Sequence, residues 1–237
     1  MNNQALWFLE NLDVTVLFCP QKNNKAGGME RHIHKTYKKG SYIYLPEDLS
    51  DRIFFLTEGR VKIGSYGDEA GKEITKAILG VGEVFGELSL IGEEKRRDFA
   101  YVMEEAVVCA ITVEEMKILM RDRSEIVVFM MKMMGSRMLE LENRLESLVF
   151  KDSRTRIIEY LYELASKKGQ RVGYETLVRK FLTHQEIANL TATSRQTVNT
   201  VLNDLRNKNI ITFNRRRLLV RNMSQLQKEM QMPAPTA

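Results

Sequence analysis

The spacing of the apolar residues changes once along this chain, near Thr112, and that change limits which folds the chain can adopt. From about Ile33 to Ile111, short runs rich in β-branched and aromatic residues alternate with glycines such as Gly59, a pattern typical of closely spaced antiparallel strands and turns. One such strand is expected over 83–91. After Thr112 the apolar residues recur about every 3.6 positions, as on an amphipathic helix. The sequence therefore predicts an α+β protein with an N-terminal antiparallel β-roll, jelly-roll-like in form, followed by a mainly helical region.

A long helix is predicted from Ser124 to about Phe150, and it carries two apolar stripes. One stripe alternates spacings of four and three residues, which makes it a heptad seam. The seam consists of Val127, Met131, Met134, Met138, Leu141, Leu145 and Leu148. The second stripe, formed by Ile126, Phe129, Met130 and Met133, is confined to the first half of the helix and could pack on the β-roll. Because two apolar faces need two partners, we expect a homodimer joined along the seam, with burial of both stripes inside one monomer as the alternative.

Charge is distributed unevenly over the 237 residues, although their net charge is only +5. Residues 150–237 contain 16 Lys and Arg against 7 Asp and Glu, a net charge of +9, whereas residues 1–149 have a net charge of −4. A basic segment attached to an acidic body favours binding to nucleic acid. Charge alone would also fit an anionic membrane surface.

Several classes of protein are disfavoured by the sequence. The apolar runs are far shorter than the roughly 18 residues that span a bilayer, and the first residues lack a secretory signal, so we expect a cytoplasmic protein with no membrane partner. Cys19 and Cys109 form no CxxC pair, so neither an iron–sulfur cluster nor a zinc ribbon is predicted, and both are expected to be packing residues. Glu30, His32 and His34 have no spacing diagnostic of a metal site. Sequence patterns of hydrolases and nucleotide-hydrolysing enzymes are missing, so no enzyme is predicted.

Residues 182–211 have the pattern of a helix-turn-helix. Thr183 and Glu186 have the spacing of a capping box at the start of the first helix, and Ser194 can cap the second. The second helix would bury Val198, Val201, Leu202 and Leu205. Its polar N-terminal residues would then face outward, where a recognition helix reaches base edges in the major groove of DNA.

Two sets of residues are predicted to contact DNA. Base edges would be read by Arg195, Gln196, Asn199 and Thr200, because arginine can pair with guanine and glutamine with adenine. Phosphates would be met by polar side chains beside helix N-termini and by a basic turn between two short strands, the wing. This second set is Thr183, His184, Gln185, Ser194, Thr197, Arg215, Arg216 and Arg217.

The order of β-roll, long helix and winged helix-turn-helix resembles the CRP/FNR family of bacterial transcription regulators over about residues 30 to 222. The motifs that carry the resemblance are FGELSLIGEEKRRDFAYV at 85–102 and LTHQEIANLTATSRQTVNTVLNDLRNKNII at 182–211. The resemblance implies a sensing domain over 1–123, a dimerisation helix over 124–150 and a DNA-binding domain over 151–237. It also implies a homodimer bound to a palindromic site in double-stranded DNA, control by an effector in the β-roll, and recruitment of RNA polymerase.

The resemblance places a candidate effector site in the β-roll. The first motif corresponds to the phosphate-binding cassette of cyclic-nucleotide proteins, in which backbone amides and an arginine hold the phosphate and a glutamate holds the ribose. The matching residues are Gly86, Glu87, Leu88 and one of Arg96 or Arg97. Asp98 stands where the family has serine or threonine, and Leu141 and Glu142 replace the hydroxyl pair that meets adenine. Cyclic AMP is therefore disfavoured; another small anion or metabolite, or no effector at all, stays open, and no cofactor is predicted.

The second motif matches the family at Ser194, Arg195, Thr197 and Val198, so the guanine contact should carry over. Gln196 and Thr200 replace the glutamate and arginine of the cyclic-AMP receptors, which implies a different half-site. Family turns usually have glycine where this chain has Ala192, so we expect a distorted turn. The alternative for the whole chain is a ligand-binding module of the kinase-regulatory or channel type without DNA function.

Overall fold

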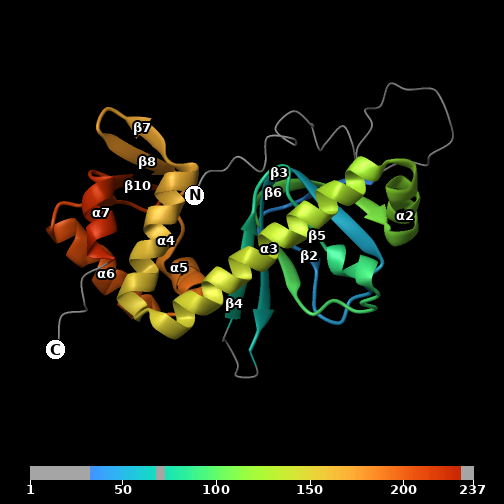
Figure 1. The fold of residues 1–237 in the computed structure, drawn as a ribbon, viewed down its shortest axis with the longest axis horizontal. Helices are drawn as coiled ribbons and strands as arrows, with labels where there is room; N and C mark the ends of the chain where they lie inside the picture. Colours follow the sequence, from blue (N-terminus) through green and yellow to red (C-terminus); the bar gives the residue numbers. More distant parts are fainter. Residues whose placement is uncertain (1–32, 68–72, 231–237) are drawn as a thin grey trace. The chain divides into compact units, whose positions relative to one another are not determined.

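The computed structural model describes residues 33–67 and 73–230 (Figure 1). The chain divides into two compact units, residues 1–137 and 138–237, and the division falls inside the long helix. Each unit is described by itself below. In the described ranges, no helix combines the length and the apolar character needed to cross a membrane.

The first unit is built on a six-stranded antiparallel sheet, which confirms the predicted β-roll. Its strands are β1 (Ile33–Tyr37), β2 (Tyr42–Tyr44), β3 (Arg52–Tyr66), β4 (Glu73–Leu79), β5 (Val84–Phe85) and β6 (Phe99–Thr112). The long strands β3 and β6 pair with each other, with Ile53 opposite Ile111 and Ile63 opposite Ala100. β6 also pairs with β1 and β2, and β3 also pairs with β4 and β5.

Gly59 does not form the predicted turn; it lies inside the continuous strand β3. Its φ is +87°, and the register of the β3–β6 pairing shifts on both sides of it. A Cβ at this position would lie 2.1 Å from the carbonyl oxygen of Glu105. Glycine is therefore needed for a bulge and a close backbone approach, not for a turn. The predicted strand over 83–91 is also wrong beyond Phe85, because Glu87–Ile91 forms a 3₁₀ helix, η1.

The apolar residues of β3 alternate between two cores. Phe54 and Leu56 face the interior of the roll, where they pack with other buried residues: Tyr44, Val61, Phe85, Val102 and Val108. Ile53 and Phe55 face the opposite side and pack against α2 (Val113–Asp122) and α3 (Ser124–Phe150). This alternation is the two-residue period of a strand with both faces buried.

The second stripe of the long helix packs on the β-roll, as predicted. Ile126 and Met130 are buried in the core between the sheet and the helices, and Phe129 and Met133 pack against it. Cys109 is fully buried in the same core. Cys19, Glu30 and His32 lie outside the described residues, and His34 is exposed on β1.

The second unit combines helices with a four-stranded antiparallel sheet in the order β7-β8-β10-β9. Its elements after α3 are α4 (Ser153–Lys168), β7 (Gln170–Val172), β8 (Glu175–Arg179), α5 (His184–Thr191), α6 (Arg195–Asn207), β9 (Ile211–Phe213), β10 (Arg217–Val220) and α7 (Met223–Glu229). Neither the hairpin β7–β8 nor the helix α7 was predicted from the sequence. The core includes Ile157 and Leu161 of α4, Ile187 of α5, and Val198 and Leu202 of α6.

Candidate nucleic-acid interface

Both predicted helix caps are present at the helix-turn-helix. Thr183 Oγ1 accepts a hydrogen bond from the backbone N–H of Glu186 at 3.2 Å, and the Glu186 carboxylate accepts from the N–H of Thr183 at 2.7 Å. Ser194 Oγ accepts from the N–H of Thr197 at 3.0 Å and so begins α6. These local bonds satisfy N–H groups that a helix N-terminus otherwise leaves open, and they fix where each helix starts.

The turn between the two helices is regular, so the predicted distortion is wrong. Ala192 has φ 50° and ψ 51°, close to the centre of the left-handed helical region. Its N–H bonds to the carbonyl oxygen of Ala188, which also accepts from the N–H of Thr193 at 3.0 Å. Alanine therefore takes the conformation that glycine would adopt with less strain.

The outward face of α6 carries the residues predicted to read bases. Arg195, Gln196, Asn199 and Thr200 are exposed, whereas Val198, Val201, Leu202 and Leu205 are buried on the opposite face. An open hollow of about 430 Å³ is lined by His184, Arg195, Gln196 and Asn199. The fold thus brings a predicted phosphate ligand, His184, beside three predicted base-reading side chains. Thr200 is not among the lining residues, and its hydroxyl donates to the carbonyl oxygen of Gln196 at 3.1 Å.

The surroundings of His184 shift its imidazole toward the neutral form. Partial burial lowers the pKa of its imidazole, and the nearby charge of Arg195 lowers it further. Its ring stands edge-on to Phe213, with the centroids 5.8 Å apart. A DNA phosphate placed here would act in the opposite direction, because a negative charge favours the protonated ring.

The other predicted phosphate ligands lie close to the two helix N-termini. Thr183, Gln185 and Ser194 are exposed, and Thr197 is half-buried. The Ser194 and Thr197 hydroxyls are 2.8 Å apart and hydrogen-bonded. The Gln185 amide donates to Asn189 at 2.8 Å.

The wing is a short hairpin whose turn is organised by Asn214. Its Oδ1 accepts from the backbone N–H groups of Arg216 and Arg217, at 2.9 Å each. This leaves the side chains of Arg215, Arg216 and Arg217 exposed. The β8–β10 register also places Arg179 opposite Arg217. Arg179 was not predicted from the sequence to be part of this basic surface. Like charges directly opposite each other destabilise a sheet, and a polyanion would relieve that repulsion.

The seam of the long helix is uncovered in the single chain. Val127 is half-buried, and the other six seam residues are exposed, with Leu141 62% accessible. In the described residues, the unit to which each of these six side chains belongs does not bury it. A row of exposed Met and Leu at heptad spacing is the surface that a coiled-coil partner covers.

In the β-roll, the two candidate effector arginines point in different directions. Arg96 is only 4% exposed; its guanidinium lies 4.6 Å from the Tyr44 ring and 5.5 Å from the Phe54 ring. It donates to the carbonyl oxygens of Gly86, at 3.0 Å, and Arg52, at 2.5 Å. The Arg97 side chain is 80% exposed and pairs with Glu93.

Glu87, the candidate ribose ligand, is already paired. Its carboxylate lies 2.5 Å from the guanidinium of Arg137 on α3, and Arg137 also donates to the carbonyl oxygen of Val84. Gly86 has φ +75°, and its carbonyl oxygen accepts from Ser89 as well as from Arg96. Leu88 is half-buried on η1.

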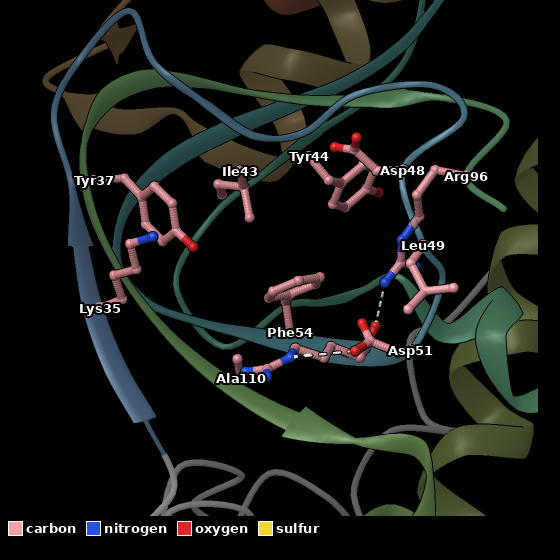
Figure 2. Close-up of a pocket in the computed structure, with 11 residues that line it drawn as sticks. Lys35, Tyr37, Ile43, Tyr44, Asp48, Leu49, Asp51, Phe54, Arg96 and Ala110 are labelled. Carbon is pink, nitrogen blue, oxygen red and sulfur yellow. Dashed lines mark hydrogen bonds and ion pairs between the residues drawn. The ribbon is translucent and has the colours of Figure 1, made fainter.

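A hollow of about 290 Å³ opens beside Arg96 (Figure 2). Aromatic rings and charged groups of both signs line it: Tyr37, Tyr44, Phe54, Lys35, Asp48, Asp51, Arg52 and Arg96. Gly86, Glu87, Leu88 and Arg97 are not among its lining residues. Burial raises the pKa of the Tyr44 hydroxyl, and the nearby carboxylate of Asp98 raises it further.

Known proteins match both halves of the chain. Residues 34–123 match the family model of the cyclic nucleotide-binding domain, and residues 155–229 match that of the Crp-like helix-turn-helix domain. A global nitrogen regulator from a Nostoc species is 30% identical over 197 residues, which is 82% of this chain and 88% of that protein. A CRP-like cAMP-activated global transcriptional regulator from Mycobacterium tuberculosis is 28% identical over 190 residues, which is 80% of this chain and 84% of that protein.

Solved structures agree with this order of parts. A mutant of CooA from Carboxydothermus hydrogenoformans superimposes with a TM-score of 0.74 at 27% identity, covering 84% of this chain and 87% of that one. The alternative of a ligand-binding module without DNA function is not supported, because the DNA-binding half has its own family match and the relatives align through it. From its β-roll through its helix-turn-helix, the chain belongs to the CRP/FNR family of transcription regulators.

Proposed function

We propose that two copies of the chain pair along the seam and bind a palindromic site in double-stranded DNA, with α6 of each copy in the major groove. The observation that carries the proposal is the capped N-terminus of α6, where Arg195, Gln196 and Asn199 are exposed while the opposite face of the helix is buried. A two-fold dimer presents two such helices, which is why half-sites repeat about one DNA turn apart.

Each exposed residue has a role in this proposal. Arg195 pairs with a guanine, Gln196 and Asn199 contact adenine or neighbouring base edges, and Thr200 packs against a base. The phosphates that flank these bases are bound by the polar residues at the starts of α5 and α6 and by the wing arginines. Arg179 joins the wing arginines in this role. The proposed role is regulatory and non-enzymatic. It is carried out in the cytoplasm, with RNA polymerase as a further partner.

The β-roll remains the proposed effector region, in the segment that contains Gly86, Glu87, Leu88, Arg96 and Arg97. Cyclic AMP is disfavoured as its ligand because Glu87 is paired with Arg137 and Arg96 already donates to two carbonyl oxygens. The favoured ligand is a small anion that pairs with Arg137 and thereby releases Glu87.

Selection of bound duplexes from a random DNA library tests the proposal. The unmodified protein is expected to yield a palindrome, either alone or in the presence of cyclic AMP, cyclic GMP or one of a panel of metabolite anions. Arg195→Ala should lose discrimination at one guanine per half-site, worth roughly 1 to 3 kcal/mol per contact. Arg171→Ala, which removes a charge from an exposed position on β7, should leave the selected sequence unchanged.

Two results would contradict the proposal. A sequence preference that is identical in Arg195→Ala and in the unmodified protein would show that α6 does not read the bases as proposed. Recovery of no sequence preference under any of these conditions would count against sequence-specific binding itself.

A further inference from the structure

Three consecutive backbone carbonyls at the end of α5 accept hydrogen bonds from arginine side chains. A helix C-terminus leaves its last carbonyls without partners inside the helix. Here Arg144 donates to the carbonyl oxygen of Leu190, and Arg156 donates to those of Thr191, at 3.0 Å, and Ala192, at 3.1 Å. The turn that leads into α6 is therefore held by side chains from outside the helix-turn-helix.

Arg156 joins this turn to the start of α4. Besides the two turn carbonyls, its guanidinium donates to the carbonyl oxygen of Lys151 at 2.8 Å and to the hydroxyl of Ser153 at 3.4 Å. A guanidinium is planar and its donors have a fixed geometry, so one side chain can hold several acceptors in a set arrangement. A lysine ammonium is a compact point charge and does not reproduce this fork.

Arg144 joins the same turn to the C-terminal part of α3, which belongs to the same compact unit. The side chain is half-buried, and this burial lowers the pKa of its guanidinium, an effect that Glu140 partly offsets. Burying a charged group is unfavourable unless it finds a hydrogen-bond partner. The carbonyl of Leu190 provides that partner, so the contact is a specific one.

We propose that Arg144 and Arg156 are positioning residues for DNA recognition: by holding the carbonyls of Leu190, Thr191 and Ala192, they set where α6 begins. Ser194 caps α6 directly after this turn, and Arg195 is the first helical residue. Because a bidentate contact to a base requires close distances and good alignment, a shift of the turn misplaces Arg195. The inference rests on the proposed role of α6 as the recognition helix.

The test uses the charge-conserving variants Arg144→Lys and Arg156→Lys in the full-length protein, with Arg171→Lys as the control. Binding is measured to a duplex selected by the unmodified protein and to a shuffled duplex of the same composition. Affinity for the selected duplex should fall by about 10-fold or more, while affinity for the shuffled duplex changes by less than about 2-fold and the salt dependence stays the same. Arg171→Lys should bind both duplexes as the unmodified protein does.

The pattern of losses separates positioning from other roles. A merely structural role would lower the melting temperature and weaken binding to both duplexes in parallel, and a phosphate contact would change the salt dependence; either result overturns the proposal. If Arg195→Ala loses discrimination but both lysine variants bind normally, the positioning proposal is wrong and the proposed function stands. If Arg195→Ala keeps its discrimination, the proposed function fails first.

Amide hydrogen exchange tests the same proposal without DNA. In the free protein, exchange over residues 191–197 should become faster in Arg144→Lys and Arg156→Lys, and it should stay unchanged in Arg171→Lys. Unchanged exchange in both variants would show that the arginines do not hold the turn, and it would overturn the proposal whatever DNA the protein selects.

Discussion

Ala192 shows how a single residue can be strained and still be accommodated. A left-handed conformation costs a residue with a Cβ about 1 to 2 kcal/mol. At Ala192 the cost is offset locally, because its N–H bonds to Ala188 and its carbonyl oxygen accepts from Arg156. The side chain is exposed, so the Cβ displaces no packed group. The turn therefore keeps the geometry of a helix-turn-helix without the glycine.

Replacing Ala192 with glycine should stabilise the protein. Ala192→Gly removes the strain of the left-handed Cβ but increases the entropy of the unfolded chain, so we expect the free energy of unfolding to rise by no more than about 1 kcal/mol. Ala188→Gly is the matched control in the interior of α5, and it should lower that free energy by about 1 kcal/mol or more. Urea unfolding measures both. A less stable Ala192→Gly would mean that Ala192 is not strained.

At the level of elements, the sequence predicts best what depends on neighbouring residues. The caps at Thr183 and Ser194 were predictable because each depends on a residue three positions away. The bulge at Gly59 was not, because it depends on the distant backbone of Glu105. The hairpin β7–β8 also depends on a distant part of the chain, because β8 pairs with β10. It was therefore missed as well.

Helix α7 was missed because its stability comes from tertiary contacts. Glu229 is almost fully buried; its carboxylate lies 2.5 Å from Arg154 of α4 and 2.9 Å from Lys208 at the end of α6. Asp204 of α6 pairs with the same two cations, at 2.7 and 3.3 Å. The hydrogen bond to Glu229 raises the pKa of Lys208. Two acids and two bases therefore join three helices.

Neutralising Glu229 should loosen this network. Glu229→Gln leaves Arg154 and Lys208 facing one carboxylate, and an under-compensated charge in a partly buried site is costly, so we expect a loss of about 1 to 3 kcal/mol in the free energy of unfolding. Glu163→Gln, which breaks an exposed pair with Lys167 on α4, should cost less than about 0.5 kcal/mol. Urea unfolding of the two variants checks this. Equal losses would mean that the network does not hold α7 in place.

For the molecule as a whole, the long helix carries two apolar stripes that its sequence pattern already separated. Ile126 and Met130 are buried against the β-roll, while the heptad seam remains uncovered. The candidate effector site was less predictable, because Arg96 and Arg97 are adjacent and chemically identical. Only the folded β-roll, in which the rings of Tyr44 and Phe54 both lie close to one guanidinium, decides which arginine is buried.

A charge placed on the seam should dissociate the proposed dimer. Leu141 is 62% exposed in the single chain, so Leu141→Asp should leave the helical content of the monomer unchanged, whereas pairing would bury an uncompensated charge. We expect sedimentation equilibrium to shift toward monomer and affinity for the selected palindrome to fall with it. Leu139→Asp is the matched control, because Leu139 is 59% exposed on the same helix but lies outside the seam; it should stay dimeric. An intact dimer in Leu141→Asp would show that the subunits pair through another surface.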